Sequence, residues 1–302
     1  MGLGEWYSLI CALMWASAVI LYKYVGDSMS ANTLNLVKNI IGLSLLLPTA
    51  VLLEGLVLPS LTVGAWAILV ISGYAGIAIA DTLYLQALRL LGAGRTAIVA
   101  SLYSPFVVIL SMLFLGERLQ LWQWCGFALV LMGILVAVYQ RHYKSLDGST
   151  LFKGMIFAAG SVLLTAAGVV AMKPLLQSSG FFWMVSLRLL AGVIGMLIYL
   201  SLRGQVLSTY RVIVGGQHRW KSIFVASVVG TYFAMVFWLA GFKYADASVA
   251  SVLNETANIF IILMAWLFLH ESLTRRKLLG VCLTFTGVVV FLGLLDISKW
   301  LA

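Results

Sequence analysis

Long apolar stretches separated by short polar links dominate the sequence and restrict what it can fold into. A helix needs about 20 apolar residues to cross a bilayer, and backbone polar groups in hydrocarbon must be paired within a helix or a closed barrel. Of the 302 residues, 63% are hydrophobic and only 10% are charged. Runs bounded by Gly, Pro, Ser or charged residues predict ten helices, at 5–25, 31–53, 63–89, 94–115, 121–140, 154–174, 180–202, 220–243, 248–269 and 275–295. We therefore expect an all-α integral membrane protein.

The second half of the sequence repeats the first. At an offset of 150 the matched pairs are Lys23/Lys173, Lys38/Arg188 and Gly42/Gly192. At an offset of 154 they are Trp66/Trp220, Gly76/Gly230, Arg89/Lys243, Phe106/Phe260, Glu117/Glu271, Gly126/Gly280 and Gly133/Gly287. Chance does not hold Glu, Gly and basic residues in one register over such a length. Five helices per half is an odd number, so the second half must enter the bilayer from the opposite face. We expect two inverted five-helix repeats, 1–145 and 146–302, an architecture that recurs in secondary transporters.

Several short motifs recur in order along both halves. The first half contains Trp15-Ala16-Ser17 before Lys23, Ala87-Leu88-Arg89, Pro105, Leu115-Gly116-Glu117-Arg118-Leu119, Gly126 and Gly133, and the second half echoes them with Leu269-His270-Glu271, Gly280 and Gly287. Together they resemble the EamA-like, ten-helix branch of the drug/metabolite transporter (DMT) superfamily. The resemblance implies a monomer-sized carrier of amino acids, amines or similar solutes, in a bacterial inner membrane and often driven by protons. The sequence departs from the family pattern at 254–258, Asn-Glu-Thr-Ala-Asn, where a proline is usual.

Four ionisable residues fall inside predicted spans: Lys38, Asp81, Arg188 and Glu255. Such residues are costly in a bilayer and are functional candidates by default. Lys38 and Asp81 both lie about eight residues, or ~12 Å, from the same membrane face, and the inversion brings Arg188 and Glu255 to a similar depth from the other face. We expect a central cavity with Lys38 paired to Asp81 and Arg188 to Glu255, which suits a zwitterion or an amine.

The two basic residues have a second interpretation, because Lys38 and Arg188 could instead fix helix packing or hold lipid headgroups. Acidic side chains cannot extend to the interface as Lys and Arg do, so Asp81 and Glu255 are the candidates for proton or cation coupling. The remaining candidates for the substrate site are aromatic and amide residues of the same zone: Trp15, Tyr22, Tyr84, Tyr103, Trp238, Asn254 and Asn258. Aromatic faces can hold a cation or an apolar group, and lipid-facing rings are the alternative.

Other functional classes find less support in the sequence. Basic residues cluster between apolar runs and not along one polar face, so nucleic acid is not an expected partner. The three cysteines and three histidines have no metal or catalytic spacing, so we expect no metal, no cofactor and no enzyme. A channel or lipid-handling protein on the same scaffold is the alternative function. The expected partners are a small-molecule substrate, membrane lipids and protons, with the chain a monomer or a loose homodimer.

The distribution of basic residues predicts the orientation. One face has Arg141, Lys144, Lys153, Arg203, Arg211, Arg219, Lys221, Arg275, Arg276 and Lys277 in loops, with Lys23, Arg89 and Arg95 near helix ends. The other face has Arg118, Lys173, Lys243 and Lys299. The positive-inside rule assigns the first face, with thirteen basic residues against four, to the cytoplasm. We therefore expect both termini outside the cytoplasm, although members of the superfamily are commonly drawn with cytoplasmic termini.

Overall fold

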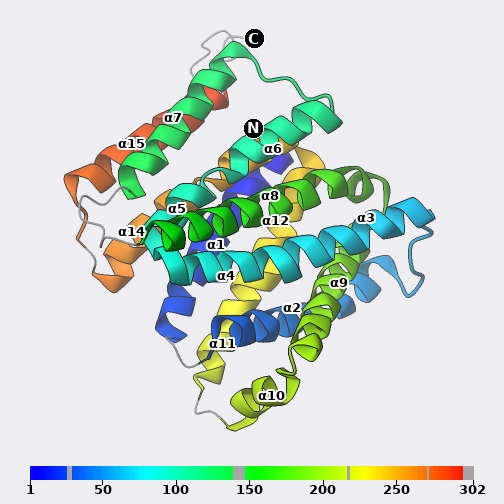
Figure 1. Cartoon of the computed structure of the whole chain (residues 1–302). Coiled ribbons are helices and arrows are strands. Elements are labelled where there is room, and N and C mark those ends of the chain that lie inside the picture. Colours follow the sequence, from blue (N-terminus) through cyan, green and yellow to red (C-terminus); the bar gives the residue numbers. More distant parts are fainter. Residues whose placement is uncertain (26–28, 139–146, 216–217, 271, 295–302) are drawn as a thin grey trace.

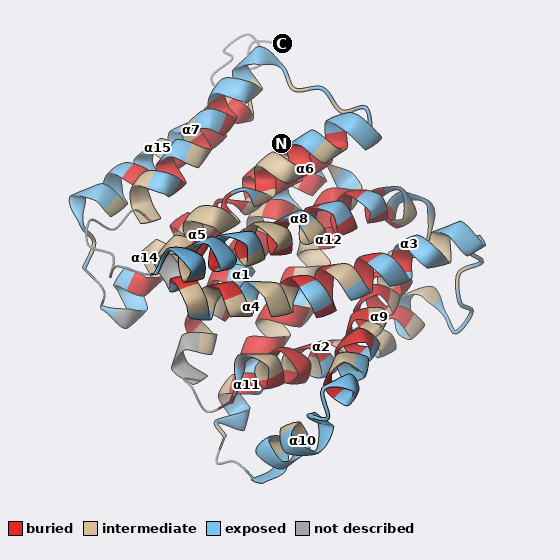
Figure 2. Ribbon diagram, in the orientation of Figure 1, coloured by how far each residue is buried: buried red, intermediate tan, exposed pale blue. Residues whose placement is uncertain are grey.

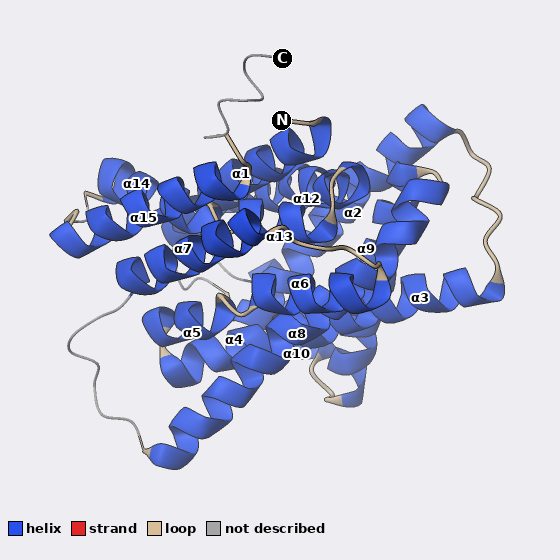
Figure 3. Cartoon of the chain, turned by 90° about the horizontal axis from the view of Figure 1, so that it is seen from above, coloured by secondary structure: helices blue, strands red, loops and turns tan. Residues whose placement is uncertain are grey.

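The computed structural model describes residues 1–25, 29–138, 147–215, 218–270 and 272–294, and within these ranges it contains helices and loops only (Figure 3). The first half comprises α1 (Leu3–Val25), α2 (Ala31–Glu54), α3 (Val63–Gly73), the π-helical segment η1 (Tyr74–Ile79), α4 (Ala80–Leu91), α5 (Ala93–Ala100), α6 (Tyr103–Phe114) and α7 (Leu121–Val138). The second half comprises α8 (Gly148–Ser178), α9 (Phe181–Leu202), α10 (Val206–Gly215), α11 (Trp220–Ser227), the π-helical η2 (Val228–Phe233), α12 (Ala234–Tyr244), α13 (Ala247–Asn254), α14 (Ala257–Leu269) and α15 (Arg275–Phe291). These helices form a bundle (Figure 1).

The ten helices predicted from the apolar runs are present in the described chain. Nine stretches there are long and apolar enough to cross a membrane. One of them, Val63–Leu91, combines α3, η1 and α4, and another, Trp220–Tyr244, combines α11, η2 and α12. The tenth helix, α15, has 17 residues and packs along α7. The chain is therefore an all-helical, multi-pass membrane protein.

Polar residues next to the apolar runs set where several helices begin. Ser30, Thr62 and Thr274 each accept a hydrogen bond from the backbone amide three residues later, at 3.2, 3.2 and 3.3 Å. Asp147 accepts bonds from the amides of Ser149 and Thr150 at the start of α8. These side chains satisfy amides that have no partner within the helix. The polar links thus define helix starts as well as separating the spans.

The two halves are built alike. From η1 onward each second-half element starts 154 residues after its first-half counterpart: η2 after η1, α12 after α4, α13 after α5, α14 after α6 and α15 after α7. Packing repeats as well, because α1 contacts α12 and α14 while its counterpart α8 contacts α4 and α6. With five crossings in each half, the repeats are inverted. Each half therefore packs its first long helix against the other half.

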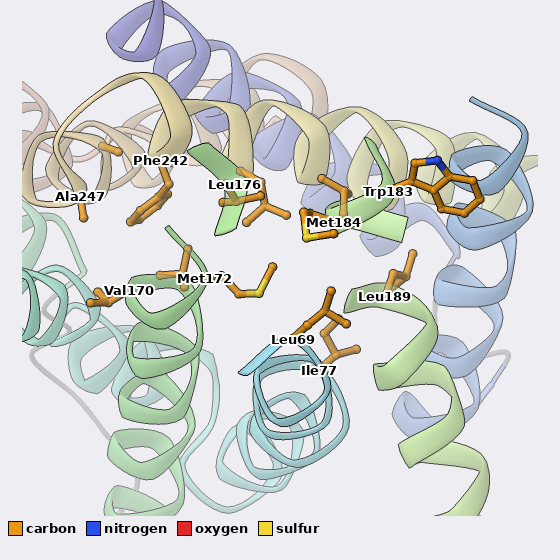
Figure 4. Packing of buried hydrophobic residues seen from close by; sticks show 14 of the residues in the cluster. Leu69, Ile77, Val170, Met172, Leu176, Trp183, Met184, Leu189, Phe242 and Ala247 are labelled. Carbon is orange, nitrogen blue, oxygen red and sulfur yellow. The ribbon is translucent and has the colours of Figure 1, made fainter. Parts of the chain in front are cut away.

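The largest apolar cluster joins both halves at the centre of the bundle. Leu69 of α3 and Ile77 of η1 pack with Met172 of α8 and with Met184 and Leu189 of α9 (Figure 4). Figure 2 shows buried residues along the middle of the bundle and exposed residues on α10 and on the outward faces. Lipid tails are as apolar as these side chains, so close packing between helices is what holds such a core together.

Glycines bring α7 and α15 together at the edge of the bundle, where Figure 1 shows the two helices side by side. A Cβ on Gly126 would lie 2.7 Å from the carbonyl oxygen of Gly287, and one on Gly133 would lie 2.7 Å from that of Gly280. Such distances leave no room for a side chain. The four glycines of the repeated motif therefore allow the backbones of the two helices to touch.

Candidate functional site

Two of the membrane helices are interrupted at equivalent positions. α5 and α6 are separated at Ser101–Leu102, and α13 and α14 are separated at Glu255–Thr256, 154 residues later. At each break an amide donates to the carbonyl three residues earlier, at 3.1 Å in both halves. The second break forms although residues 254–258 contain no proline. It positions Glu255, which is 7% exposed, inside the span Ala247–Phe268.

The π-helical segments lie against the other half. In η1, a Cβ on Gly76 would lie 2.9 Å from Nη2 of Arg188. In η2, a Cβ on Gly230 would lie 3.4 Å from the hydroxyl of Tyr22. π-Helical turns occur frequently at functional sites. Here their glycines leave space for polar side chains of the opposite repeat.

Arg188 is buried in the middle of α9, where its side chain is enclosed by both halves. The residue is 1% exposed. Its Nε donates to Oγ of Ser72 at 2.8 Å, and Ser72 in turn donates to the carbonyl of Gly168 at 2.9 Å. Its guanidinium lies over the ring of Trp238, 5.2 Å from the ring centroid. Nη1 is buried and has no hydrogen-bond partner among the described residues.

An aromatic pair continues from Arg188 toward the helix break that contains Glu255. Nε1 of Trp238 donates to the hydroxyl of Tyr103 at 3.2 Å, and Tyr103 begins α6, which packs against α13. Nδ2 of Asn258 donates to Oε2 of Glu255 at 3.0 Å. The structure thus gathers five of the predicted site residues from α6, α9, α12 and the α13–α14 break.

Lys38 and Asp81 form an ion pair, with Nζ 3.6 Å from Oδ2. The expected pair of Arg188 and Glu255 is wrong, because no described carboxylate lies within 4.0 Å of Arg188. Arg188 instead turns toward Ser72 and Trp238, which lie on other helices than the break that holds Glu255. The two charges are therefore separate groups.

The remaining predicted residues have mixed surroundings. Trp15 is 43% exposed and Tyr84 is 37% exposed, so neither is enclosed by protein. Asn254 has two buried side-chain atoms, Oδ1 and Nδ2, that lack a partner among the described residues, and the buried hydroxyl of Tyr22 lacks one as well. Buried polar atoms are normally hydrogen-bonded. A polar solute or water fits such positions.

Sequence reasoning missed a polar stripe on α2 beside Lys38. Asn35 and Asn39 are 3% and 0% exposed, and Asn39 Nδ2 donates to Asn35 Oδ1 at 3.3 Å while Lys38 Nζ donates to Asn39 Oδ1 at 3.4 Å. The spacing of these residues, three and four apart within an apolar helix, places them on one face. That spacing was visible in the sequence. Ser72, in contrast, gave no sequence signal that set it apart from other serines.

A second polar cluster lies at the end of the bundle where α1 begins. Lys173 Nζ lies 2.8 Å from Glu117 Oε1 and also 2.8 Å from the carbonyl of Ala245. Glu117 further accepts bonds from the amides of Ala247 and Ser248 at the start of α13. A cavity of about 500 Å³ opens beside this pair. Partial burial raises the pKa of the Glu117 carboxyl, but the bonds from Lys173 and the α13 start outweigh burial, and the net pKa is below its ordinary value of 4.5.

Two residues of the matched repeat pairs cannot be placed, because Glu271 and the side chain of Lys23 lie outside the described residues. The same holds for Arg141, Lys144 and Lys299 of the basic-residue count. The described ends of α1, α8 and α12 agree with the membrane faces that the sequence predicts for them. A Cβ on Gly4 at the start of α1 would contact the backbone of Ala245, and Ala245 accepts from Lys173. The start of α1, the end of α12 and the end of α8 therefore share one face.

Relatives of the chain are transporters by name. A protein of Archaeoglobus fulgidus, called an uncharacterized transporter, is 34% identical over 82 residues, which are 26% of this chain and 30% of that protein, so the match spans under a third of the relative's length. The Bacillus subtilis transporters YoaV and YvbV, also called uncharacterized, are 23% and 26% identical over 204 and 228 residues. These matches cover 67% of both chains for YoaV, and 74% of this chain and 70% of the relative for YvbV.

Comparison with solved structures and family profiles agrees on the architecture. A crystal structure at 15% identity matches with a TM-score of 0.75 over 95% of both chains, which shows a shared fold. The profile of the EamA-like transporter family matches twice, at residues 2–139 and 152–293. The two matches correspond to the two halves that repeat in sequence and packing, and the chain belongs to the EamA-like transporter family.

Proposed function

We propose that this chain is a secondary transporter that carries a small metabolite, such as an amino acid, an amine or a related solute, through a site between its two halves. The observation that carries the proposal is the guanidinium of Arg188, which is buried inside a membrane span without a described counterion. A charge in that position is expensive and is retained for a function. Membership of a family of transporters supports the same reading.

The proposed site combines groups that suit a small polar solute. Arg188 and Glu255 supply opposite charges that do not pair with each other, and Asn254 supplies a free amide. Trp238 and Tyr103, which are hydrogen-bonded to each other, supply aromatic surface. Inverted-repeat transporters bind substrate where the halves meet and expose it alternately to the two faces. A site assembled from α6, α9, α12 and the α13–α14 break fits that mechanism.

Asp81 and Glu255 are the proposed coupling residues. Each is a carboxyl group within a membrane span, and a carboxyl group can exchange a proton or bind a cation as the site changes its exposure. Asp81 is held by Lys38 and Glu255 by Asn258. Transport through the site is then coupled to protons or ions. Without a proton or ion gradient the protein catalyses facilitated exchange of the solute.

The proposed cellular setting follows from the same sequence reasoning. We place the protein in a bacterial inner membrane as a monomer or a loose homodimer, with repeats 1–145 and 146–302 and with both termini outside the cytoplasm. Membrane lipids surround the bundle. A small solute enters the site from either face in turn.

Counterflow in proteoliposomes tests this function. Vesicles containing the purified protein are loaded with an unlabelled solute from a panel of amino acids, polyamines, nucleosides and choline-like cations, and then diluted into the labelled solute. A carrier accumulates label transiently and with saturable kinetics. Label that only equilibrates, without overshoot or saturation, would identify a channel and contradict the proposal. Empty vesicles and vesicles with denatured protein are the controls.

A further inference from the structure

The charge on Arg188 differs from those on Lys38 and Lys173, each of which has an acidic partner. Lys38 is balanced by Asp81 at 3.6 Å, and Lys173 is balanced by Glu117 at 2.8 Å. No described acidic group approaches Arg188 within 4.0 Å, although the residue is 1% exposed. A buried charge without a partner costs several kcal/mol in general. An anion that arrives from outside the chain would remove that cost.

The Arg188 guanidinium is bonded to protein through Nε, while Nη1 has no described partner. Ser72 accepts from Nε and uses its own hydroxyl proton on the carbonyl of Gly168, so it has no further donor for another group. The backbones of Gly76 and Gly168 lie beside Nη2, since a Cβ on Gly76 would lie 2.9 Å and one on Gly168 3.6 Å from that nitrogen, so neither residue covers it with a side chain. Nη1 therefore retains donors that no described residue uses.

The site fits an anion with a single charge. One guanidinium neutralises one negative charge, and its planar pair of donors matches the two oxygens of a carboxylate. A phosphate dianion would remain with one uncompensated charge in a low-dielectric site, because Lys38 is already neutralised by Asp81. The ring of Trp238 covers one face of the guanidinium and excludes a second anion there.

We propose that Arg188 binds the carboxylate of the transported solute, so that the substrates are monocarboxylates, amino acids included, and amines without a carboxylate are not substrates. This inference rests on the proposed transport function and narrows its substrate class. Arg188 then acts as the anchor of the solute, and the aromatic pair Trp238 and Tyr103 contacts its remaining part.

Matched ligand pairs test the inference on the unmodified protein. Thermal unfolding of the purified wild type is measured with the common amino acids and simple monocarboxylates, and with the carboxamide of each, which replaces the carboxylate by an uncharged group of similar shape. A ligand at 100 times its dissociation constant stabilises by about 2.7 kcal/mol, which is a measurable shift. We expect stabilisation by at least one carboxylate and none by its carboxamide. Equal shifts with acid and carboxamide, or no shift with any carboxylate, would overturn the inference.

A variant pair localises the effect. Arg188→Gln removes the charge at the site, whereas Arg203→Gln removes the same charge from the exposed end of the same helix. For the carboxylate found above, we expect Arg188→Gln to weaken binding about 30-fold or more, as removal of one partner of a buried charge pair does, and Arg203→Gln to leave it unchanged. Equal affinity of both variants for that carboxylate would show that it binds elsewhere. If Arg188→Gln does not fold, the ligand pairs on the wild type decide the question alone.

Failure of this inference can be told apart from failure of the transport function. Saturable counterflow of an amine or of a carboxamide would leave the protein a transporter while removing the carboxylate role of Arg188. If no solute shows counterflow but carboxylates still stabilise the protein and Arg188→Gln abolishes that effect, the anion site is supported and the transport function is not.

Discussion

At the scale of single residues, the two repeats differ in how they balance the basic residue inside their second span. Lys38 and Asp81 lie at the same depth on neighbouring helices, and they meet. Arg188 is the repeat equivalent of Lys38, but at the offset of 154 the equivalent of Asp81 is Met235, not Glu255. The second half therefore has no acid in the position that would pair with Arg188. The similar depth of Arg188 and Glu255 was therefore not enough to make them a pair.

The coupling role of the two acids can be tested by neutralising them. Asp81→Asn and Glu255→Gln keep the shape of each side chain and remove its exchangeable proton, so we expect gradient-driven uptake to fall at least about tenfold, and to fall more than ligand binding does. Uptake is measured in proteoliposomes with an imposed pH or cation gradient. Asp246→Asn, which removes an exposed acid outside the spans, is the control. Normal concentrative uptake by both membrane variants would rule out the coupling role.

At the scale of helices and turns, the apolar runs predicted the spans because hydrophobic length is a property of sequence alone. They did not predict η1 and η2, whose extra residue per turn depends on what packs against Gly76 and Gly230. They also treated residues 203–219 as a loop, whereas α10, Val206–Gly215, is a helix without buried residues. The sequence left a break at Glu255–Thr256 undecided, because it offers no proline there.

The Glu117–Lys173 pair yields a prediction about stability and pH. Glu117 joins the end of α6 to α8 and to the start of α13, so Glu117→Gln should lower the free energy of unfolding by on the order of 2 kcal/mol at neutral pH. The folded-state pKa of Glu117 lies below the unfolded value near 4.5. Its contribution is therefore present above that value and is lost as the pH falls through the folded-state pKa.

Thermal unfolding of wild type and Glu117→Gln from pH 7 to pH 3.5 checks this prediction, and the difference between them should shrink at the acid end. Glu54 is a matched comparison, because it accepts bonds from the amides of Phe182 and Trp183 at the start of α9 but forms no ion pair with a described residue. Glu54→Gln should therefore lose less stability. A difference between wild type and Glu117→Gln that stays constant down to pH 3.5 would refute the linkage.

At the scale of the whole molecule, the inverted repeat makes either orientation in the membrane structurally similar, so loop charge is free to choose between them. The count of thirteen basic residues against four predicts that the face bearing α10 is cytoplasmic and that both termini are not. A reporter that is active only outside the cytoplasm should therefore be active when it is fused after Ala302. A fusion active only in the cytoplasm, or cysteine labelling of residues 272–274 from outside alone, would show the opposite orientation.

Helices α7 and α15 lie at the edge of the bundle, so we expect them to lie away from the substrate. These two helices pack mainly on each other through Gly126, Gly133, Gly280 and Gly287 and contribute no charged residue to the membrane interior. Substrate should therefore contact the helices that surround Arg188 and not this pair. The repeat alone could not have located the site, because it assigns every helix a counterpart without saying which ones enclose the solute.

The most direct test of the central claim is the location of a bound solute, determined by electron cryo-microscopy of the protein with the ligand that gives the largest thermal shift. We expect density between the two halves, in contact with Arg188, Trp238 and the break at Glu255–Thr256. Density that mainly contacts α7 and α15, at Leu129, Met132, Leu283 or Thr286, would contradict it.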